Sequence, residues 1–128
     1  MRRPHGFTLV EVIVALVILS GVLLAMTDFT RQLTRQTTDA ANTAKASDIA
    51  VQQLEAVKAW RTYATVVSTF GGNDVTYAAG DPYAGLRRQT LVVRTGPTAT
   101  ADFVTVTVVV SGAGLGAPLR RSTIIAAF

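Results

Sequence analysis

Residues 7–26 read FTLVEVIVALVILSGVLLAM, a run of 20 residues in which Glu11 is the only charged side chain. Twenty helical residues rise about 30 Å, which is the thickness of the hydrocarbon core of a bilayer. The run contains no proline, and a short basic segment with Arg2 and Arg3 precedes it. The sequence therefore predicts a helix that crosses a membrane.

Two other interpretations of this run are less consistent with the residues. A secretory signal peptide has a shorter apolar region and ends at a small-x-small site, whereas this run continues into Met26, Thr27 and Asp28. A buried core helix needs cover on every side, which the remaining hundred residues can hardly supply. A permanent anchor agrees with the positive-inside rule, because Arg2 and Arg3 precede the run and Asp28 follows it.

The composition excludes several classes of protein. Hydrophobic residues make up 49% of the chain and charged residues 16%, which argues against intrinsic disorder. The absence of cysteine excludes a disulfide scaffold and a thiolate metal site, and the single histidine, His5, nearly excludes a histidine-based triad. The net charge is +4, and it falls to +2 without Arg2 and Arg3, so composition alone does not indicate a nucleic-acid-binding protein.

Glu11 is the unusual residue of the apolar run. Near the start of the helix, its carboxylate can reach the membrane interface and favours the positive end of the helix dipole. Alternatively, it has a cationic partner inside the membrane. No Lys or Arg lies between residues 4 and 30, so that partner would be another molecule or a newly freed N-terminus.

Residues 6–12, GFTLVEV, closely resemble the N-terminus of type IV pilins and of the pseudopilins of type II secretion systems. The family pattern is a short basic leader ending in glycine, then Phe, three mostly apolar residues, Glu and about fifteen more apolar residues. Every element is present at matching spacing, and the motif covers residues 1 to about 26.

The resemblance implies a processing chemistry. A membrane aspartyl prepilin peptidase would cut between Gly6 and Phe7 on the cytoplasmic side, and the same enzyme would methylate the new α-amine of Phe7. Glu11 would then pair with the Phe7 ammonium of a neighbouring subunit and fix the register of assembly. The chain is then a substrate of enzymes rather than an enzyme, and we expect no cofactor and no metal site.

The expected organisation has four parts: a leader at residues 1–6, a membrane-spanning half-helix at 7–27, an amphipathic half-helix at 28–62, and a loop and sheet region at 63–128. One near-continuous helix over residues 7–62 would be about 84 Å long. Its second half would lie on the sheet through a periodic apolar set: Ala46, Ala50, Leu54, Val57 and then Trp60 or Arg61. The other faces would carry Gln52, Gln53, Glu55, Lys58 and Arg61.

The C-terminal region predicts a small antiparallel sheet. Val occupies every second position from residue 104 to residue 110, so Val104, Val106, Val108 and Val110 should share one face and pack on the helix. Residues 86–95 and 119–127 should flank this strand in a meander. Residues 65–85 should be loop, with a short strand near residues 75–77. The expected fold is α+β, a long helix on an antiparallel meander, which is the pilin fold.

Three aspartates, Asp74, Asp81 and Asp102, raise the alternative of calcium binding, but their spacing matches no calcium loop and ordinary turns explain them better. A local excess of arginine is best explained by solvated strand ends that discourage edge pairing. A contact with phosphate, from lipid headgroups or from nucleic acid during DNA uptake, is the alternative. The arginines are Arg87, Arg88, Arg94, Arg120 and Arg121.

The most consistent function is a structural subunit of a type IV pilus-like filament or a type II secretion pseudopilus, resembling a minor pilin or an I-type minor pseudopilin. Its partners would be the prepilin peptidase/methyltransferase, other pilins, the inner-membrane assembly platform and membrane lipid. It would span the inner membrane once, with a cytoplasmic N-terminus. Asp28 stands near the place where many pilus-forming pilins carry a proline, which argues against a major pilin. The alternative function is an anchored binding module that never polymerises.

Overall fold

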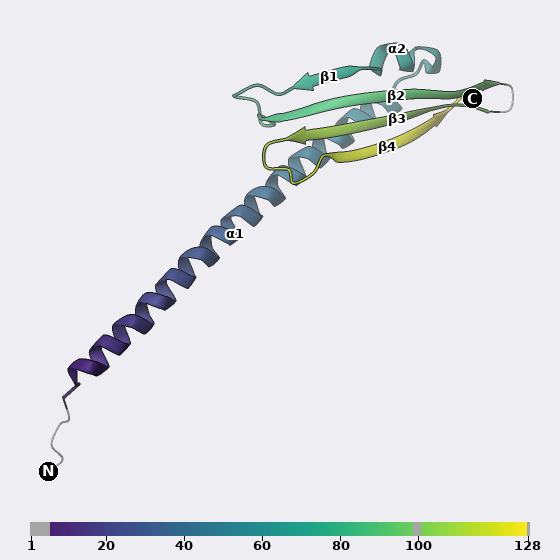
Figure 1. The fold of residues 1–128 in the computed structure, drawn as a ribbon. Coiled ribbons are helices and arrows are strands. Elements are labelled where there is room, and N and C mark those ends of the chain that lie inside the picture. The colour runs from purple at the N-terminus through teal and green to yellow at the C-terminus, as the bar shows by residue number, and fades with distance from the viewer. Residues whose placement is uncertain (1–5, 99–100, 128) are drawn as a thin grey trace. The chain divides into compact units, whose positions relative to one another are not determined.

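The computed structural model describes residues 6–98 and 101–127 (Figure 1). The chain divides into two compact units, Met1–Thr37 and Thr38–Phe128, and the helix α1 has residues in both. The elements in chain order are α1 (Leu9–Lys58), η1 (Tyr63–Thr65), α2 (Val66–Phe70), β1 (Asn73–Thr76), β2 (Leu86–Thr98), β3 (Ala101–Gly112) and β4 (Leu119–Ala126).

The first unit is helical from Leu9 onward, and its apolar side chains are exposed on all sides of α1. This stretch is long and apolar enough to cross a membrane by length and composition, and none of it is buried within the structure. Its hydroxyls are satisfied within the helix. Ser20 Oγ donates to the carbonyl oxygen of Leu16 at 2.7 Å, and Thr27 Oγ1 donates to that of Leu23 at 3.0 Å. Hydroxyls that bond to the preceding turn are compatible with an apolar surrounding.

In the second unit, the face of α1 that is buried is the one that the spacing of apolar residues predicts. Ala46, Ile49, Ala50 and Val57 are at most 1% exposed, and Leu54 is 8% exposed. The two alanines are small, so the helix backbone can approach the sheet closely. These residues form one cluster with the fully buried valines of β3, as expected: Val104, Val106, Val108 and Val110.

The sheet is an antiparallel meander in the order β1-β2-β3-β4 (Figure 1). Val106 lies opposite Val92 on one side and Thr123 on the other. Because side chains alternate between the two faces of a strand, this register places the four fully buried valines of β3 on the helix side. The prediction of an α+β fold, with a long helix packed on a small antiparallel sheet as in pilins, is confirmed.

The predicted C-terminal end of the long helix is wrong. The helix was expected to continue to about Thr62, but α1 ends at Lys58, and the chain leaves the helix near Trp60. There, the indole Nε1 of Trp60 donates to Thr65 Oγ1 at 3.0 Å, and its ring packs edge-to-face on Phe70. These contacts hold the chain in a turn that neither glycine nor proline announces in the sequence.

The interval expected to be loop also contains regular structure. Residues 63–70 form η1 and α2, and Val66 of α2 is 1% exposed in the core cluster. The short strand expected near residues 75–77 is β1, shifted to Asn73–Thr76. On α1, Gln53 is 6% exposed and lies within the sheet-facing surface, whereas it was expected on another face.

Candidate functional site

The predicted processing position, Gly6 and Phe7, precedes the first turn of α1. Neither residue has regular secondary structure, and Phe7 is 83% exposed. A Cβ atom placed on Gly6 would meet no heavy atom within 4 Å, so the backbone is open on that side. The peptide bond between Gly6 and Phe7 is therefore sterically accessible to an enzyme. Residues 1–5, which hold Arg2 and Arg3, lie outside the described residues.

Thr8 caps the N-terminus of α1, a role that the sequence reasoning missed. The backbone N–H of Glu11 donates to Thr8 Oγ1 at 3.3 Å and to the Thr8 carbonyl oxygen at 3.1 Å. The N–H of Val12 also reaches that carbonyl, at 3.2 Å. The signal in the sequence is Thr8-x-x-Glu11 directly before an apolar run, which is the pattern of a capping box. The motif thus sets the first residue of the helix.

Glu11 lies in the first turn of α1 and is exposed. A carboxylate at this position is favoured by the helix dipole. Across residues 6–98 and 101–127, its carboxylate takes part in no hydrogen bond and no ion pair. Glu11 is therefore an acidic group within an apolar surface whose partner is not supplied by the described part of the chain.

A shallow groove of about 340 Å³ runs along the same face of the helix. It is lined by Phe7, Glu11, Val12, Ala15, Leu16 and Leu19. These residues are separated by three, four or one positions, so they form one stripe along the helix. Their only ionisable side chain is Glu11. The candidate site is consequently an exposed peptide bond, followed by an apolar groove that contains one carboxylate.

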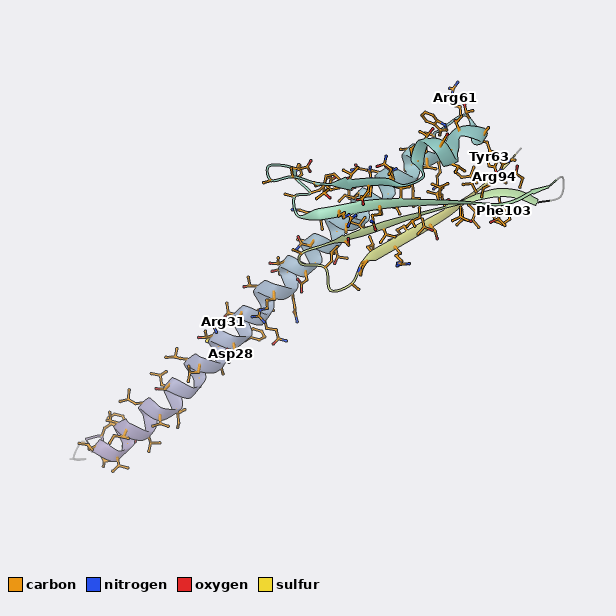
Figure 2. All side chains as sticks on the ribbon, turned by 45° about the horizontal axis from the view of Figure 1, so that its top comes forward. Asp28, Arg31, Arg61, Tyr63, Arg94 and Phe103 are labelled. Atoms are coloured by element: carbon orange, nitrogen blue, oxygen red, sulfur yellow. The ribbon has the colours of Figure 1, made fainter. Side chains whose placement is uncertain are left out.

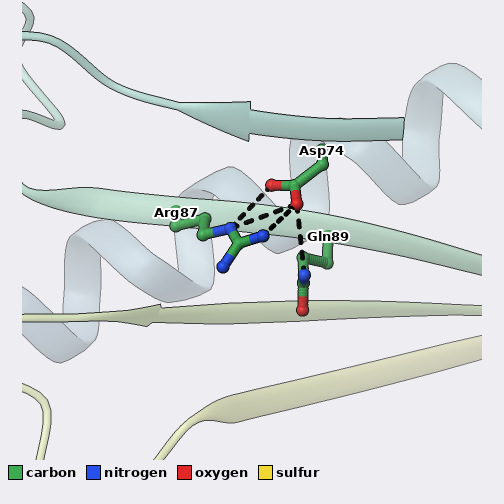
Figure 3. A network of polar contacts seen from close by, with 3 residues as sticks. All are labelled: Asp74, Arg87 and Gln89. Carbon is green, nitrogen blue, oxygen red and sulfur yellow. Dashed lines mark hydrogen bonds and ion pairs between the residues drawn. The ribbon is translucent and has the colours of Figure 1, made fainter. Parts of the chain in front are cut away.

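The three aspartates considered for calcium lie in separate contacts. Asp74 accepts a hydrogen bond from Arg87 Nε at 2.8 Å and pairs with the guanidinium, while Gln89 Nε2 donates to it at 3.2 Å (Figure 3). The bonds from Arg87 and then Gln89 lower the pKa of Asp74 to about 2. Asp81 Oδ1 accepts the backbone N–H of Tyr83 within a turn.

Asp102 links β3 to β2 and η1. Arg94 donates to it through Nε at 2.8 Å and through its terminal nitrogen at 2.6 Å, and Tyr63 donates its hydroxyl at 2.7 Å. Tyr63 and Arg94 are close neighbours in Figure 2, and the guanidinium carbon lies 5.5 Å from the centre of the tyrosine ring. The bonds from Arg94 and then Tyr63 lower the pKa of Asp102 to about 2. Among residues 6–98 and 101–127, no group of three or more His, Cys, Asp or Glu side chains is placed to hold a metal ion.

The five arginines of the sheet region do not have equivalent surroundings. Arg87 and Arg94 are in the two ion pairs with aspartates, and Arg88 reaches Asn73 Oδ1 at 3.4 Å. Arg120 and Arg121 on β4 are exposed and form no ion pair within the described part of the chain. The predicted role of these arginines as solvated strand ends therefore suits Arg120 and Arg121 best.

The comparisons with known proteins bear on the N-terminus. The family model of the prokaryotic N-terminal methylation motif matches residues 1–27. Neither a curated protein nor a solved structure matches the chain. The recognition of these residues as the motif of type IV pilins and pseudopilins is confirmed by the family model. The apolar helix together with this motif supports membrane anchoring.

Proposed function

From the N-terminal methylation motif of residues 1–27, we propose that this chain is a structural subunit of a type IV pilus-like filament or of a type II secretion pseudopilus. One observation carries the proposal: the residues that match this motif include both an exposed Gly6–Phe7 bond and Glu11. Glu11 has no partner in the described part of the chain, and it lies with Phe7 in one apolar groove. In this proposal, residues 1–6 are the leader and residues 7–27 span the inner membrane. Residues 28–62 and 63–128 form the extracytoplasmic part.

The processing step begins with hydrolysis of the Gly6–Phe7 peptide bond by a prepilin peptidase. Hydrolysis leaves a carboxylate on Gly6 of the released leader and an α-ammonium on Phe7. The same enzyme would then transfer a methyl group from a methylsulfonium donor to the deprotonated amine, which releases the donor as a thioether and leaves a secondary ammonium that keeps the positive charge. The exposure of Phe7 and the open backbone at Gly6 support cleavage at this bond, because a protease must contact both sides of the bond that it cuts.

The assembly step uses the charge that cleavage creates. A carboxylate inside a bilayer costs on the order of 2.5–3.5 kcal/mol near the midplane by insertion scales. Glu11 lies only four residues inside the proposed span, so it would bear part of that cost, and pairing with the Phe7 ammonium of a neighbouring subunit would offset it. The apolar residues of the same groove, such as Val12 and Leu16, would contact the neighbour's helix. The pair would thereby fix the axial position of one subunit on the next.

Three substitutions separate the charge of Glu11 from its place in the capping box. Glu11→Gln keeps a residue type of the capping-box pattern but removes the charge, and Glu11→Ala removes both; the hydrogen bond from the backbone N–H of residue 11 to Thr8 is retained in each. Glu55→Gln is the matched control, because Glu55 is an exposed carboxylate on the same helix, and its only ion pair within the described residues is with Lys58 at 3.4 Å. We expect membrane insertion in all three variants. Filament assembly should be lost in both Glu11 variants and retained in Glu55→Gln.

The assay is electron microscopy and cross-linking of filaments from cells that express each variant in place of the wild-type chain. Normal assembly of Glu11→Gln together with failure of Glu11→Ala would mean that Glu11 acts through helix capping. Normal assembly of both variants would contradict the proposed register role.

Within this family, a minor subunit is the more specific proposal. The apolar helix has Gly21, while Asp28 occupies the region where many pilus-forming pilins carry a proline. An anchored binding module that never polymerises is the second candidate, supported by the fully formed core of the second unit. It predicts that wild-type chain in membranes forms no Glu11-dependent cross-links between copies.

A further inference from the structure

A second polar feature lies on α1, directly after the proposed membrane span. Asp28, Arg31, Gln32 and Arg35 line a concavity of about 450 Å³ on the helix surface. Figure 2 labels Asp28 and Arg31 on this stretch of helix. The four residues are separated by three, one and three positions, so they lie on one side of the helix. The concavity therefore brings two guanidinium groups and one carboxylate to the same surface.

None of these charges is neutralised by a neighbour in the described part of the chain. Asp28, Arg31 and Arg35 take part in no ion pair or side-chain hydrogen bond there, although Asp28 and Arg31 are three positions apart. In the sheet region, by contrast, charged groups are paired: Arg94 binds Asp102 with two nitrogens. The polar groups of the concavity are thus available to an external ligand.

The position along the helix favours a lipid ligand. This step rests on the proposed span of residues 7–27. Arg31 and Arg35 then lie about 6 Å and 12 Å beyond its last residue along the axis. The headgroup layer extends roughly 5–8 Å from the hydrocarbon core. Helical side chains lean toward the N-terminus of their helix, so both arginine side chains are directed back toward that layer.

The charge pattern selects one kind of headgroup. Two guanidinium groups at i and i+4 suit a phosphate, which accepts several hydrogen bonds from arginine. Asp28 would repel a bare phosphate but accept hydrogen bonds from a primary ammonium group. We propose that the Asp28–Arg31–Gln32–Arg35 concavity binds the headgroup of a phosphatidylethanolamine-type lipid, with the phosphate on Arg31 and Arg35 and the ammonium on Asp28. This site would hold the helix at a fixed depth in the outer leaflet.

The test uses the full chain in nanodiscs that contain equal amounts of phosphatidylethanolamine and phosphatidylcholine with identical acyl chains. Native mass spectrometry then identifies the lipids that remain on the protein after release. We expect the wild-type chain to prefer phosphatidylethanolamine by roughly two- to fivefold, the range of an exposed ion pair. The wild type should discriminate because the trimethylammonium of phosphatidylcholine lacks the N–H donors that the Asp28 carboxylate accepts. Asp28→Asn removes that carboxylate, so it should retain phospholipid without the preference.

The double variant Arg31→Gln/Arg35→Gln should lose most of the retained phospholipid. Arg120→Gln/Arg121→Gln is the matched control, since it removes two exposed charges from β4, and it should behave as wild type. Unchanged phospholipid retention in Arg31→Gln/Arg35→Gln would overturn the headgroup site. An equal loss of phospholipid in both double variants would also overturn it. Displacement of the lipid by millimolar inorganic phosphate would also overturn it, in favour of a soluble anion.

Two further outcomes separate this site from the proposed function. If the chain is recovered in nanodiscs but Arg31→Gln/Arg35→Gln alters only cross-linking between copies, the concavity is a protein interface and the lipid proposal is wrong. If the wild-type chain is not recovered with nanodiscs at all, membrane anchoring fails, and the headgroup site fails with it.

Discussion

Val57 and Val51 allow a matched test of the packing that holds α1 to the sheet. Both are valines on the same helix, but Val57 is 1% exposed and Val51 is 45% exposed. Replacing either by alanine removes two carbon atoms and improves helix propensity by the same few tenths of a kcal/mol. The difference between Val57→Ala and Val51→Ala therefore isolates burial.

The expected difference follows from the exposure. Two buried carbons contribute about 1.6 kcal/mol of transfer free energy at about 0.8 kcal/mol each. The cavity that remains adds to this, so we expect Val57→Ala to be less stable than Val51→Ala by about 2 kcal/mol. That is a large part of the roughly 5–15 kcal/mol by which ordinary domains are stable.

The assay is urea unfolding of the full chain in detergent micelles, followed by fluorescence of Trp60, the single tryptophan. With a urea dependence of about 2 kcal/mol per molar, the midpoint of Val57→Ala should lie roughly 1 M below that of Val51→Ala. Val51→Ala should remain near wild type. Equal midpoints for the two variants would contradict the packing of the helix on the sheet as described.

Two other predictions concern the second unit. Gly114 has a φ of +82°, a backbone conformation that strains alanine, so Gly114→Ala should lower the free energy of unfolding by about 1 kcal/mol or more. The new Cβ would also press on the side-chain amide of Asn42 on α1, which can swing aside. Gly116→Ala has open space around it and should not be destabilised; equal midpoints in urea for the two variants would refute the strain at Gly114. The pKa of Asp102 is lowered from 3.8 to about 2, chiefly by Arg94, so its ion pair contributes stability above pH 4 that is lost as the pH falls from 4 toward 2. Asp102→Asn should therefore lose less stability than wild type between pH 5 and pH 2 in thermal unfolding, and parallel pH profiles for the two proteins would exclude this role.

Periodic segments of the sequence predict their structure well. The alternation of valine in residues 103–110 gives the buried face of β3, because a period of two has one outcome once one face is covered by a helix. The spacing of Ala46, Ala50, Leu54 and Val57 likewise gives the buried face of α1. Both patterns arise from contacts that repeat along one element, so they are visible without knowledge of the partner.

The features that were missed depend on contacts between segments. Trp60 leaves α1 to reach Thr65 and Phe70, and nothing in residues 59–62 breaks a helix by itself. α2 is too short for a periodic pattern, and its one buried residue, Val66, packs into the core formed by other segments. Gln53 is polar, and its place in the sheet-facing surface follows from its position in the helix rather than from its residue type.

The candidate site was predicted from the motif, and one local signal was overlooked. Gly6, Phe7 and Glu11 were identified because the spacing of the family pattern includes them. Thr8 was not, although Thr8-x-x-Glu11 before an apolar run is a signal for the start of a helix. Glu11 therefore combines two roles in one position, a helix-favouring carboxylate and, in the proposed function, the partner of a neighbour's N-terminus.

The intact mass and N-terminal residue of the chain extracted from its native membrane test the central proposal most directly. The proposed function predicts a chain that starts at Phe7 and carries one additional methyl group on its N-terminal nitrogen. A chain that still starts at Met1, in cells where another pilin is processed, would contradict the proposed maturation and favour the anchored module. A chain that starts near Thr27 would show a cleaved secretory signal and contradict both.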